Sequence, residues 1–537
     1  IFLDGGSKTV VQNNFIGTDI DGKNLIGNKN NGLRMLDSKN NQIGGEIGVA
    51  GNLISSNFEN GILISDGSSE NLVQGNLIGT DIDGQVINEI GNDLNGVRIV
   101  NASGNLIGGD IGVTGNVISD NLESGVLIEA ENEGDVSGNM VHGNLIGTDI
   151  TGLQKAGNLL NGIKIQDAFF NKIGNATDQT RNIISGNGLY GIYITGESAD
   201  ANEVSGNYIG TSINGNAAIP NTDGVVIFNG ATGNIVGGSA DGEGNVISAN
   251  ARTGIFIGGN KFTGTDTQGN IISGNFIGTD AQGKSSFLGN KEEGVLISDA
   301  SGNYVGGLTP EAGNIIADNF EGVTIVDTNP TIKPNAKENH VEGNVIGVDI
   351  GRIESSIKMA AGVVIKNADN NIIGGFTQKT GLAPGNLIAN NEDYGIHFIN
   401  TQGKPFDGGN IIEGNIIGFG VGEGRSNGIG VCVENMDNNT IEKNRIRENK
   451  MAGVVIRTVN NGQANSNHIK QNEIYQNFEL GIDLENNNVT PNDSGDGDTG
   501  ANGLQNYPVI TGVTSSSVNG KLESLPNTSF TVELFSN

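Results

Sequence analysis

The stretch NGVRIVNASGNLIGGDIGVTGNVISDN, residues 95–121, contains three short apolar segments separated by glycine and asparagine. The first begins at Gly96 and reads glycine, apolar, variable, apolar; the second is NLIGG at 105–109 and the third is GNVISDN at 115–121. Strands this short cannot support a sheet alone, but stacked copies can pair with one another at about 4.8 Å per turn. The stretch therefore predicts one coil of a solenoid with three strands per turn.

The first segment recurs along almost the whole chain, and the first spacings between copies are 29, 35 and 29 residues. Self-similarity of this kind is typical of repeat architectures. We therefore predict an all-β solenoid of about fifteen coils, in which a short coil alternates with a long one. The copies begin at Gly32, Gly61, Gly96, Gly125, Gly162, Gly191, Gly224, Gly254, Gly294, Gly322, Gly362, Gly395, Gly428, Gly453 and Gly481.

Side chains of a strand alternate between its two faces, so the constant second and fourth places of the segment, Val or Ile, should line the interior. An asparagine also recurs just before an apolar pair in each coil. Stacked amides can hydrogen-bond to one another and to the backbone of the turns, so we predict an internal ladder. Its members are Asn76, Asn116, Asn144, Asn182, Asn207, Asn245, Asn275, Asn314, Asn344, Asn386 and Asn415.

The third place of the segment varies and should point outward. Several copies carry large apolar residues there, interrupted by Arg98 and Lys164. A stripe of this kind is either an interface with another molecule or a surface that the long loops of every second coil cover. The candidate interface residues are Leu63, Leu127, Tyr193, Val226, Phe256, Leu296 and Val364.

The repeated phrases GN-x-IGTD, x-IGG and GNVIS-x-N resemble those of the right-handed parallel β-helix repeat proteins of large bacterial surface and secreted polypeptides, which have the pectin-lyase-like fold. The resemblance covers roughly residues 10–510. It implies a right-handed parallel β-helix. It does not select a function, because this family mixes surface modules with lyases, epimerases and fructotransferases.

Composition restricts the class of protein. The chain has 88 glycines, no tryptophan and 5% aromatic residues, which suits a narrow rod better than a globular core. Its formal net charge of -31 would repel a phosphate backbone, so nucleic acid is not an expected partner. No apolar stretch is long enough to cross a bilayer. The single cysteine, Cys432, lies in the run GIGVCV and is interpreted as a packed thiol; the chain itself is interpreted as an excised fragment.

The repeat stops after Gly481. By resemblance, we place the β-helix at 1–490, an acidic glycine-rich boundary at 491–505, and a cap or truncated β-sandwich at 506–537, where GKLESLPNTSFTVELFSN at 520–537 looks like a hairpin. Asp493, Asp496 and Asp498 supply a density of hard oxygen ligands that suits Ca²⁺, and the alternative is a merely hydrophilic linker.

The GTDIDG turns offer a second pattern of carboxylates, with Asp19 and Asp21, then Asp81 and Asp83. They could hold a ladder of ions. Later copies replace the second aspartate by threonine, asparagine or glutamine, which favours turns closed by bonds from side chain to backbone.

An enzyme on this fold would need a local constellation on the outer surface. The phrases of related enzymes, Gly-His-Gly, Arg-Ile-Lys and Asp-Pro-His-Glu, do not occur, and the four histidines are scattered. The least regular part, 397–450, is where catalysis would be sought first, with carboxylates spaced for glycoside chemistry. The residues concerned are His397, Asp407, Glu413, Glu423 and Arg425.

The regularity of the repeat favours a non-enzymatic extracellular module, structural or adhesive, such as a surface fibre, filament or spacer. Its expected partners are other protein subunits or surface glycans, and Ca²⁺ is the only cofactor that the sequence indicates. The alternatives are a polysaccharide-active β-helix enzyme and a module that binds glycans without cleaving them. Enzymes on this fold interrupt the repeat with long loops, whereas here the coil pair persists to about residue 390.

Overall fold

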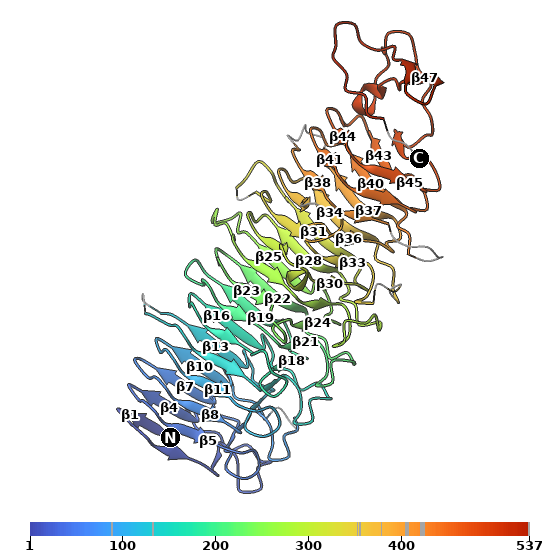
Figure 1. The fold of residues 1–537 in the computed structure, drawn as a ribbon. Helices are drawn as coiled ribbons and strands as arrows, with labels where there is room; N and C mark the ends of the chain where they lie inside the picture. The colour runs from blue at the N-terminus through green and yellow to red at the C-terminus, as the bar shows by residue number, and fades with distance from the viewer. Residues whose placement is uncertain are drawn as a thin grey trace.

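A computed structural model describes residues 1–534 apart from 87–89, 132–133, 334, 352, 354–355, 377–378, 403–407 and 419–424. The described chain forms a rod of stacked coils, with the N-terminus at one end and an irregular segment that carries β47 at the other (Figure 1). Three parallel sheets run along the rod, with sixteen, fifteen and fifteen strands. We number them sheets 1, 2 and 3, in the order in which their strands follow one another along each coil.

Sheet 1 comprises β1 (Phe2–Asp4), β4 (Leu33–Leu36), β7 (Ile62–Ser65), β10 (Val97–Val100), β13 (Val126–Glu129), β16 (Ile163–Gln166), β19 (Tyr190–Thr195), β22 (Asp223–Phe228), β25 (Ile255–Gly258), β28 (Glu293–Ser298), β31 (Glu321–Val326), β34 (Ala361–Lys366), β37 (Tyr394–Ile399), β40 (Ile429–Glu434), β43 (Val454–Arg457) and β46 (Ile482–Leu484). Sheet 2 comprises β2 (Val10–Val11), β5 (Gln42–Gly44), β8 (Leu72–Gln74), β11 (Leu106–Gly108), β14 (Met140–His142), β17 (Lys172–Ile173), β20 (Glu203–Val204), β23 (Ile235–Gly237), β26 (Ile271–Ser273), β29 (Tyr304–Gly306), β32 (His340–Glu342), β35 (Ile372–Gly374), β38 (Ile411–Glu413), β41 (Thr440–Glu442) and β44 (His468–Lys470). Sheet 3 comprises β3 (Phe15–Ile16), β6 (Leu53–Ile54), β9 (Leu77–Ile78), β12 (Val117–Ile118), β15 (Leu145–Ile146), β18 (Ile183–Ile184), β21 (Tyr208–Ile209), β24 (Val246–Ile247), β27 (Phe276–Ile277), β30 (Ile315–Ile316), β33 (Val345–Ile346), β36 (Leu387–Ile388), β39 (Ile416–Ile417), β42 (Arg445–Arg447) and β45 (Glu473–Tyr475).

Each of the first fifteen coils contributes one strand to each sheet, and β46 adds a sixteenth strand to sheet 1 alone. Each strand therefore pairs with the strand three places further along the chain. The predicted solenoid of about fifteen coils with three strands per turn is confirmed. The interior is as predicted too: Ile62, Ile64, Val97 and Ile99, at the second and fourth places of the segment, are completely buried. Among the described residues, no helix is long and apolar enough to span a membrane.

One copy of the segment was assigned wrongly. The run GIGVCV contains two overlapping matches, and the pairing of Val431 with Val454 shows that Gly430, not Gly428, begins the structural repeat. Val431 and Val433 then point inward, where both are fully buried. Cys432 consequently occupies the outward third place, beside His397 of the preceding coil.

Asparagine ladders close all three corners of the coil. Between sheets 2 and 3, the predicted ladder is confirmed: Asn144 Nδ2 donates to Asn182 Oδ1 at 3.0 Å, and Asn182 Nδ2 donates to Asn207 Oδ1 at 2.8 Å. A second ladder between sheets 1 and 2 includes Asn171 and Asn202, whose amides are 3.0 Å apart. A third asparagine ladder lies between sheets 3 and 1. The sequence analysis predicted neither the second ladder nor the third.

The long loops that contain GTDIDG and its variants stack on one another, two coils apart. Ile150 N donates to Gly84 O at 3.1 Å, and Ile213 N donates to Gly152 O at 3.0 Å. Ile150 and Ile213 pack on the outward residues of sheet 3, a buried cluster formed by Leu53, Leu77, Val117, Leu145 and Ile183. The long loops therefore cover the outer face of sheet 3.

Within these loops the aspartates close turns. Asp81 Oδ1 accepts hydrogen bonds from the backbone N of Asp83 at 3.0 Å and of Gln85 at 2.8 Å. Asp280 makes the same pair of bonds to Gln282 and Lys284, both at 2.9 Å. The turn interpretation of this pattern is confirmed.

The last coil is closed by a short 3₁₀ segment, η2 (Ala501–Leu504), the second after η1 (Pro310–Ala312). Ala501 is fully buried against the core, and Asn467 N donates to Asn502 Oδ1 at 3.0 Å, so Asn502 extends the second ladder by one step. The division into 1–490, 491–505 and 506–537 stays a prediction.

The C-terminal hairpin exists, but its position was predicted wrongly. It is formed by β47 (Val509–Val513) and β48 (Val518–Lys521), which are antiparallel, and no strand occurs among the described residues 522–534. The polar run 514–517 makes the turn, where Thr514 N donates to Ser517 O at 2.8 Å. That turn was overlooked in favour of the Pro-Asn pair further on.

The ladders predict a measurable effect of one amide. In Asn207→Ala, the backbone N and Nδ2 of Asn182 lose their buried acceptor, Asn207 Oδ1. Asn245 Oδ1 and Ile173 O each lose one donor and keep a backbone N–H donor, from residue 207 and from Ser205. Stranded buried polar groups cost about 1–3 kcal/mol each, so the midpoint of urea unfolding should fall clearly. The exposed Asn216→Ala is the matched control. Equal midpoints for the two variants would contradict a stabilising ladder.

Candidate functional site

The predicted outer stripe exists as one ladder on sheet 1. Tyr193, Val226 and Phe256 are consecutive partners in register, and the other members continue the same line. Neighbouring side chains bury much of it: Leu63 is 9%, Leu127 8%, Val226 4% and Val364 6% exposed, and Tyr193, Phe256 and Leu296 are half-buried. Ile150 and Ile213 of the long loops pack on sheet 3. Its role as an interface stays a prediction.

Beside the stripe runs a line of acidic side chains, each immediately before the glycine of its segment: Asp223, Glu293 and Glu321, which we call the carboxylate column. Glu293 and Glu321 are partners on adjacent strands. Thr253 occupies the same place in the coil between Asp223 and Glu293. Its backbone N donates to Asp223 Oδ1 at 3.0 Å, and its hydroxyl donates to Glu293 Oε2 at 3.3 Å.

Burial changes the acidity of two members of the column. Asp223 is only 4% exposed, and removal from water raises its pKa, although Arg252, 3.7 Å away, partly opposes this. Burial likewise raises the pKa of Glu293, and the charge of the neighbouring Glu321 adds to the effect. A carboxyl group with a raised pKa next to a second carboxyl is the pairing that general acid–base chemistry uses.

Aromatic rings flank the column on the outer face of sheet 1. Tyr190 is the partner of Asp223, and its ring meets that of Tyr193 edge to face at a centroid distance of 5.1 Å. Phe228 and Phe256 form a second pair at 6.4 Å. Rings beside a few placed polar groups are typical of ligand-binding surfaces. The sequence interpretation missed this surface, although the phrases DGVV, EGVL and EGVT carry its signal.

The three predicted Ca²⁺ ligands do come together. Carboxylate oxygens of Asp493, Asp496 and Asp498 lie within 4.8 Å of one another. Asp496 Oδ1 accepts a hydrogen bond from Asn506 N at 2.8 Å, and its Oδ2 accepts one from the Ser524 hydroxyl. Asp493 Oδ1 and Asp498 Oδ1 are buried and have no hydrogen-bond partner in the described part of the chain. This donor set, made of oxygen alone, fits a hard cation such as Ca²⁺.

Of the residues proposed for catalysis around 397–450, the three that the structure describes are not gathered in one place. Asp407 and Glu423 lie outside the described residues. His397 is on the outer face of sheet 1, whereas Glu413 ends β38 in sheet 2 and pairs with Lys443 at 2.7 Å. Arg425 lies in the connection from sheet 3 to sheet 1.

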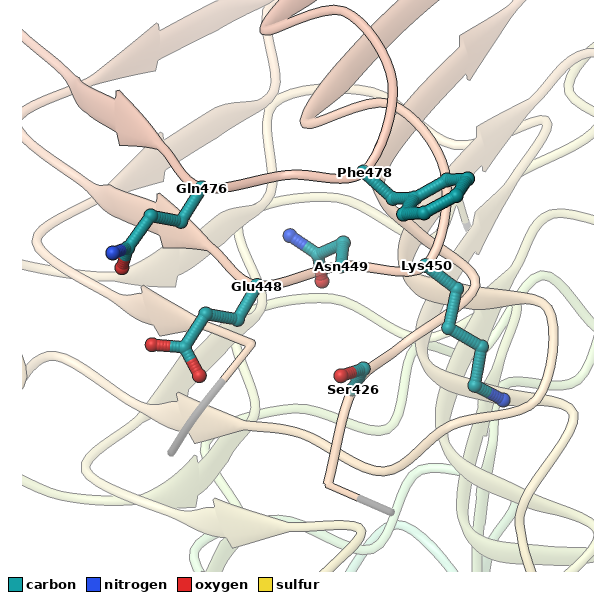
Figure 2. A pocket seen from close by; sticks show the side chains of 6 residues that line it. All are labelled: Ser426, Glu448, Asn449, Lys450, Gln476 and Phe478. Atoms are coloured by element: carbon teal, nitrogen blue, oxygen red, sulfur yellow. The ribbon is translucent and has the colours of Figure 1, made fainter. Parts of the chain in front are cut away.

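A shallow depression lies on that same connection, near the C-terminal end of the rod (Figure 2). It is lined by Ser426, Glu448, Asn449, Lys450, Gln476 and Phe478. Its one carboxylate, Glu448, pairs with Arg447 at 3.4 Å, and the Phe478 ring is 86% exposed. The depression therefore lacks the paired carboxylates of the column.

Three parallel sheets wound in a fixed order make the chain a parallel β-helix protein with the pectin-lyase-like architecture, as the resemblance implied. No protein-family model matches the sequence, and no curated protein matches it.

Solved structures similar to this chain include the periplasmic alginate epimerase AlgG, with 12% identity, a TM-score of 0.26, and 84% of this chain and 76% of that one covered. The A-module of the Azotobacter vinelandii mannuronan C-5 epimerase AlgE4 has 12% identity, a TM-score of 0.25, and coverages of 87% and 91%. A mutant tailspike protein of E. coli bacteriophage HK620, in complex with a pentasaccharide, has 10% identity, a TM-score of 0.21, and coverages of 85% and 68%. At these values no site residue is carried over.

The carboxylate column predicts a pH effect on stability. Because burial raises the folded-state pKa of Glu293, its contribution to stability is complete below the unfolded pKa of about 4.3 and is lost as the pH rises through the folded value. In Glu293→Gln this loss is absent. The melting temperature of the variant should therefore rise relative to that of the wild type as the pH increases from acid to neutral. The exposed Glu311→Gln should show a constant difference. A constant difference for both would contradict the raised pKa.

Proposed function

We propose that the chain is an extracellular structural or adhesive β-solenoid module, a stiff spacer that carries a repeated surface. The observation that carries this proposal is the unbroken register: all three sheets continue from the first coil to the last without a missing strand. At about 4.8 Å per coil, fifteen coils give a rod of about 70 Å. Such a rod cannot bend at a hinge without breaking several ladders at once.

The stacked long loops support the same proposal, because they bind one long coil to the next long coil, two steps away, by backbone hydrogen bonds. The outer face of sheet 1 carries varied side chains at the third place of the segment. We propose that other protein subunits or surface glycans bind there, along the stripe from Leu63 to Val364.

A second candidate, a polysaccharide-active enzyme, is favoured by one observation, the carboxylate column. Glu293, whose pKa is raised by burial, could protonate a glycosidic oxygen, and Glu321 on the adjacent strand could act as base or nucleophile. Carboxyl groups of glycosidases stand about 5–10 Å apart, a range that side chains on adjacent strands can reach. Tyr190 and Tyr193 would offer ring faces to a sugar.

Electron microscopy of the full chain and a polysaccharide panel together separate the two candidates. The structural proposal predicts straight rods of about 70 Å per chain and no release of product from any polysaccharide. Release of oligosaccharides would overturn it. In that event Glu293→Gln and Glu321→Gln should each lower the rate by about 10²- to 10⁴-fold, and the exposed Glu311→Gln should not.

We propose further that Ca²⁺ binds Asp493, Asp496 and Asp498 and stabilises the closed end of the rod. At a hundredfold excess over Kd, mass action would add about 2.7 kcal/mol to the stability of this segment. Amide hydrogen exchange at 492–507 should slow on addition of Ca²⁺ in the wild type and in the exposed control Asp241→Asn, and not in Asp496→Asn. Unchanged exchange at millimolar Ca²⁺ would refute the site.

A further inference from the structure

A second group of ligand-type side chains lies on the outer face of sheet 1, near the C-terminal end of the rod. It consists of His397 on β37 and of Cys432 and Glu434 on β40. His397 and Cys432 are partners in register, and Glu434 follows Cys432 by two residues on the same face. A ring nitrogen, the sulfur and a carboxylate oxygen lie within 4.8 Å of one another.

The imidazole of His397 is fixed in place beside the other two groups. Its Nε2 atom is buried and has no hydrogen-bond partner among the described residues. The ring of Tyr394 stacks on it, with centroids 4.2 Å apart, and fixes its plane. A buried nitrogen without a partner is costly unless something binds it.

The carboxylate of Glu434 is held by Arg457. Arg457 donates to Glu434 Oε2 from Nε at 2.8 Å and from Nη2 at 2.6 Å, and it also donates to the Tyr394 hydroxyl at 3.2 Å. Both of these contacts use Oε2, so Oε1 is the oxygen that can face a metal ion. Metal-binding carboxylates are commonly fixed by a hydrogen-bond donor on their other oxygen, as here.

The sulfur completes the set. Cys432 is fully buried and is the only cysteine of the chain, so no intrachain disulfide competes for it. Burial raises the pKa of the thiol to about 12, and the charge of Arg457 opposes this. Metal binding would displace the thiol proton into solvent, and the resulting thiolate and the Glu434 carboxylate would together neutralise a doubly charged cation.

We propose that His397, Cys432 and Glu434 bind one divalent cation of the zinc type, with a fourth position open to water. One nitrogen, one sulfur and one oxygen ligand suit a borderline cation and do not suit Ca²⁺, which takes oxygen alone. The site therefore differs in chemistry from the aspartate cluster beyond the last coil. The group lies on the outer face of sheet 1, separate from the apolar interior of the solenoid.

Cobalt titration of the full chain tests the site. After treatment with a chelator and its removal, with Ca²⁺ added in excess to fill sites made of oxygen, Co²⁺ should bind at one equivalent and produce a thiolate-to-cobalt charge-transfer band. Zn²⁺ should abolish the band by displacement. Cys432→Ser should give no band, and His397→Asn and Glu434→Gln should each weaken Co²⁺ binding at least about tenfold.

The exposed His468→Asn is the control for histidine and should leave the titration unchanged. Absence of the band in the folded wild type at saturating Co²⁺ overturns the proposal, and this result does not depend on how any variant folds. A band of unchanged affinity in both His397→Asn and Glu434→Gln also overturns it, because cobalt would then bind the cysteine alone.

Discussion

The structure depends on one interaction, the hydrogen bond from the side-chain amide of one asparagine to that of its equivalent in the next coil. A narrow rod must turn its chain sharply at three corners, and each turn buries polar backbone groups that water cannot reach. The side-chain amide of Asn207 illustrates how these groups are satisfied. It donates to Asn245 of the next coil and to the main-chain carbonyl of Ile173, and it accepts a hydrogen bond from Asn182. The same bonds fix the register of strands as short as two residues.

Because the interior asparagine ladders fix the register of the strands, the outward-facing residues of each coil can vary. On sheet 3, isoleucines of the long loops pack on the outward residues and cover them. The outer face of sheet 1 carries carboxylates and aromatic rings in the middle of the rod, and the His397, Cys432 and Glu434 group towards its C-terminal end. Stacked coils set such groups in lines, so a single residue type in a single column is repeated at a constant distance.

The sequence predicted the coil, its interior and one ladder, because these depend on residues that recur at a fixed place. It failed where the pattern was ambiguous or where chemistry arose between coils. The overlapping matches in GIGVCV hid the outward place of Cys432, and with it the proximity to His397. Asp223, Glu293 and Glu321 precede their glycines and look like turn residues until the four coils that they span are aligned. The overlooked turn at 514–517 misplaced the hairpin in the same way.

The stacking of long loops on every second coil constrains how such a rod can change its length. Ile150 lies on Gly84, and Ile213 lies on Gly152, across an intervening short coil. A duplication or deletion of one coil would set a long loop directly against another or leave a gap in the row, whereas the gain or loss of two coils restores every contact. Where long loops stack, the structural unit of this rod is therefore the pair of coils rather than the single coil.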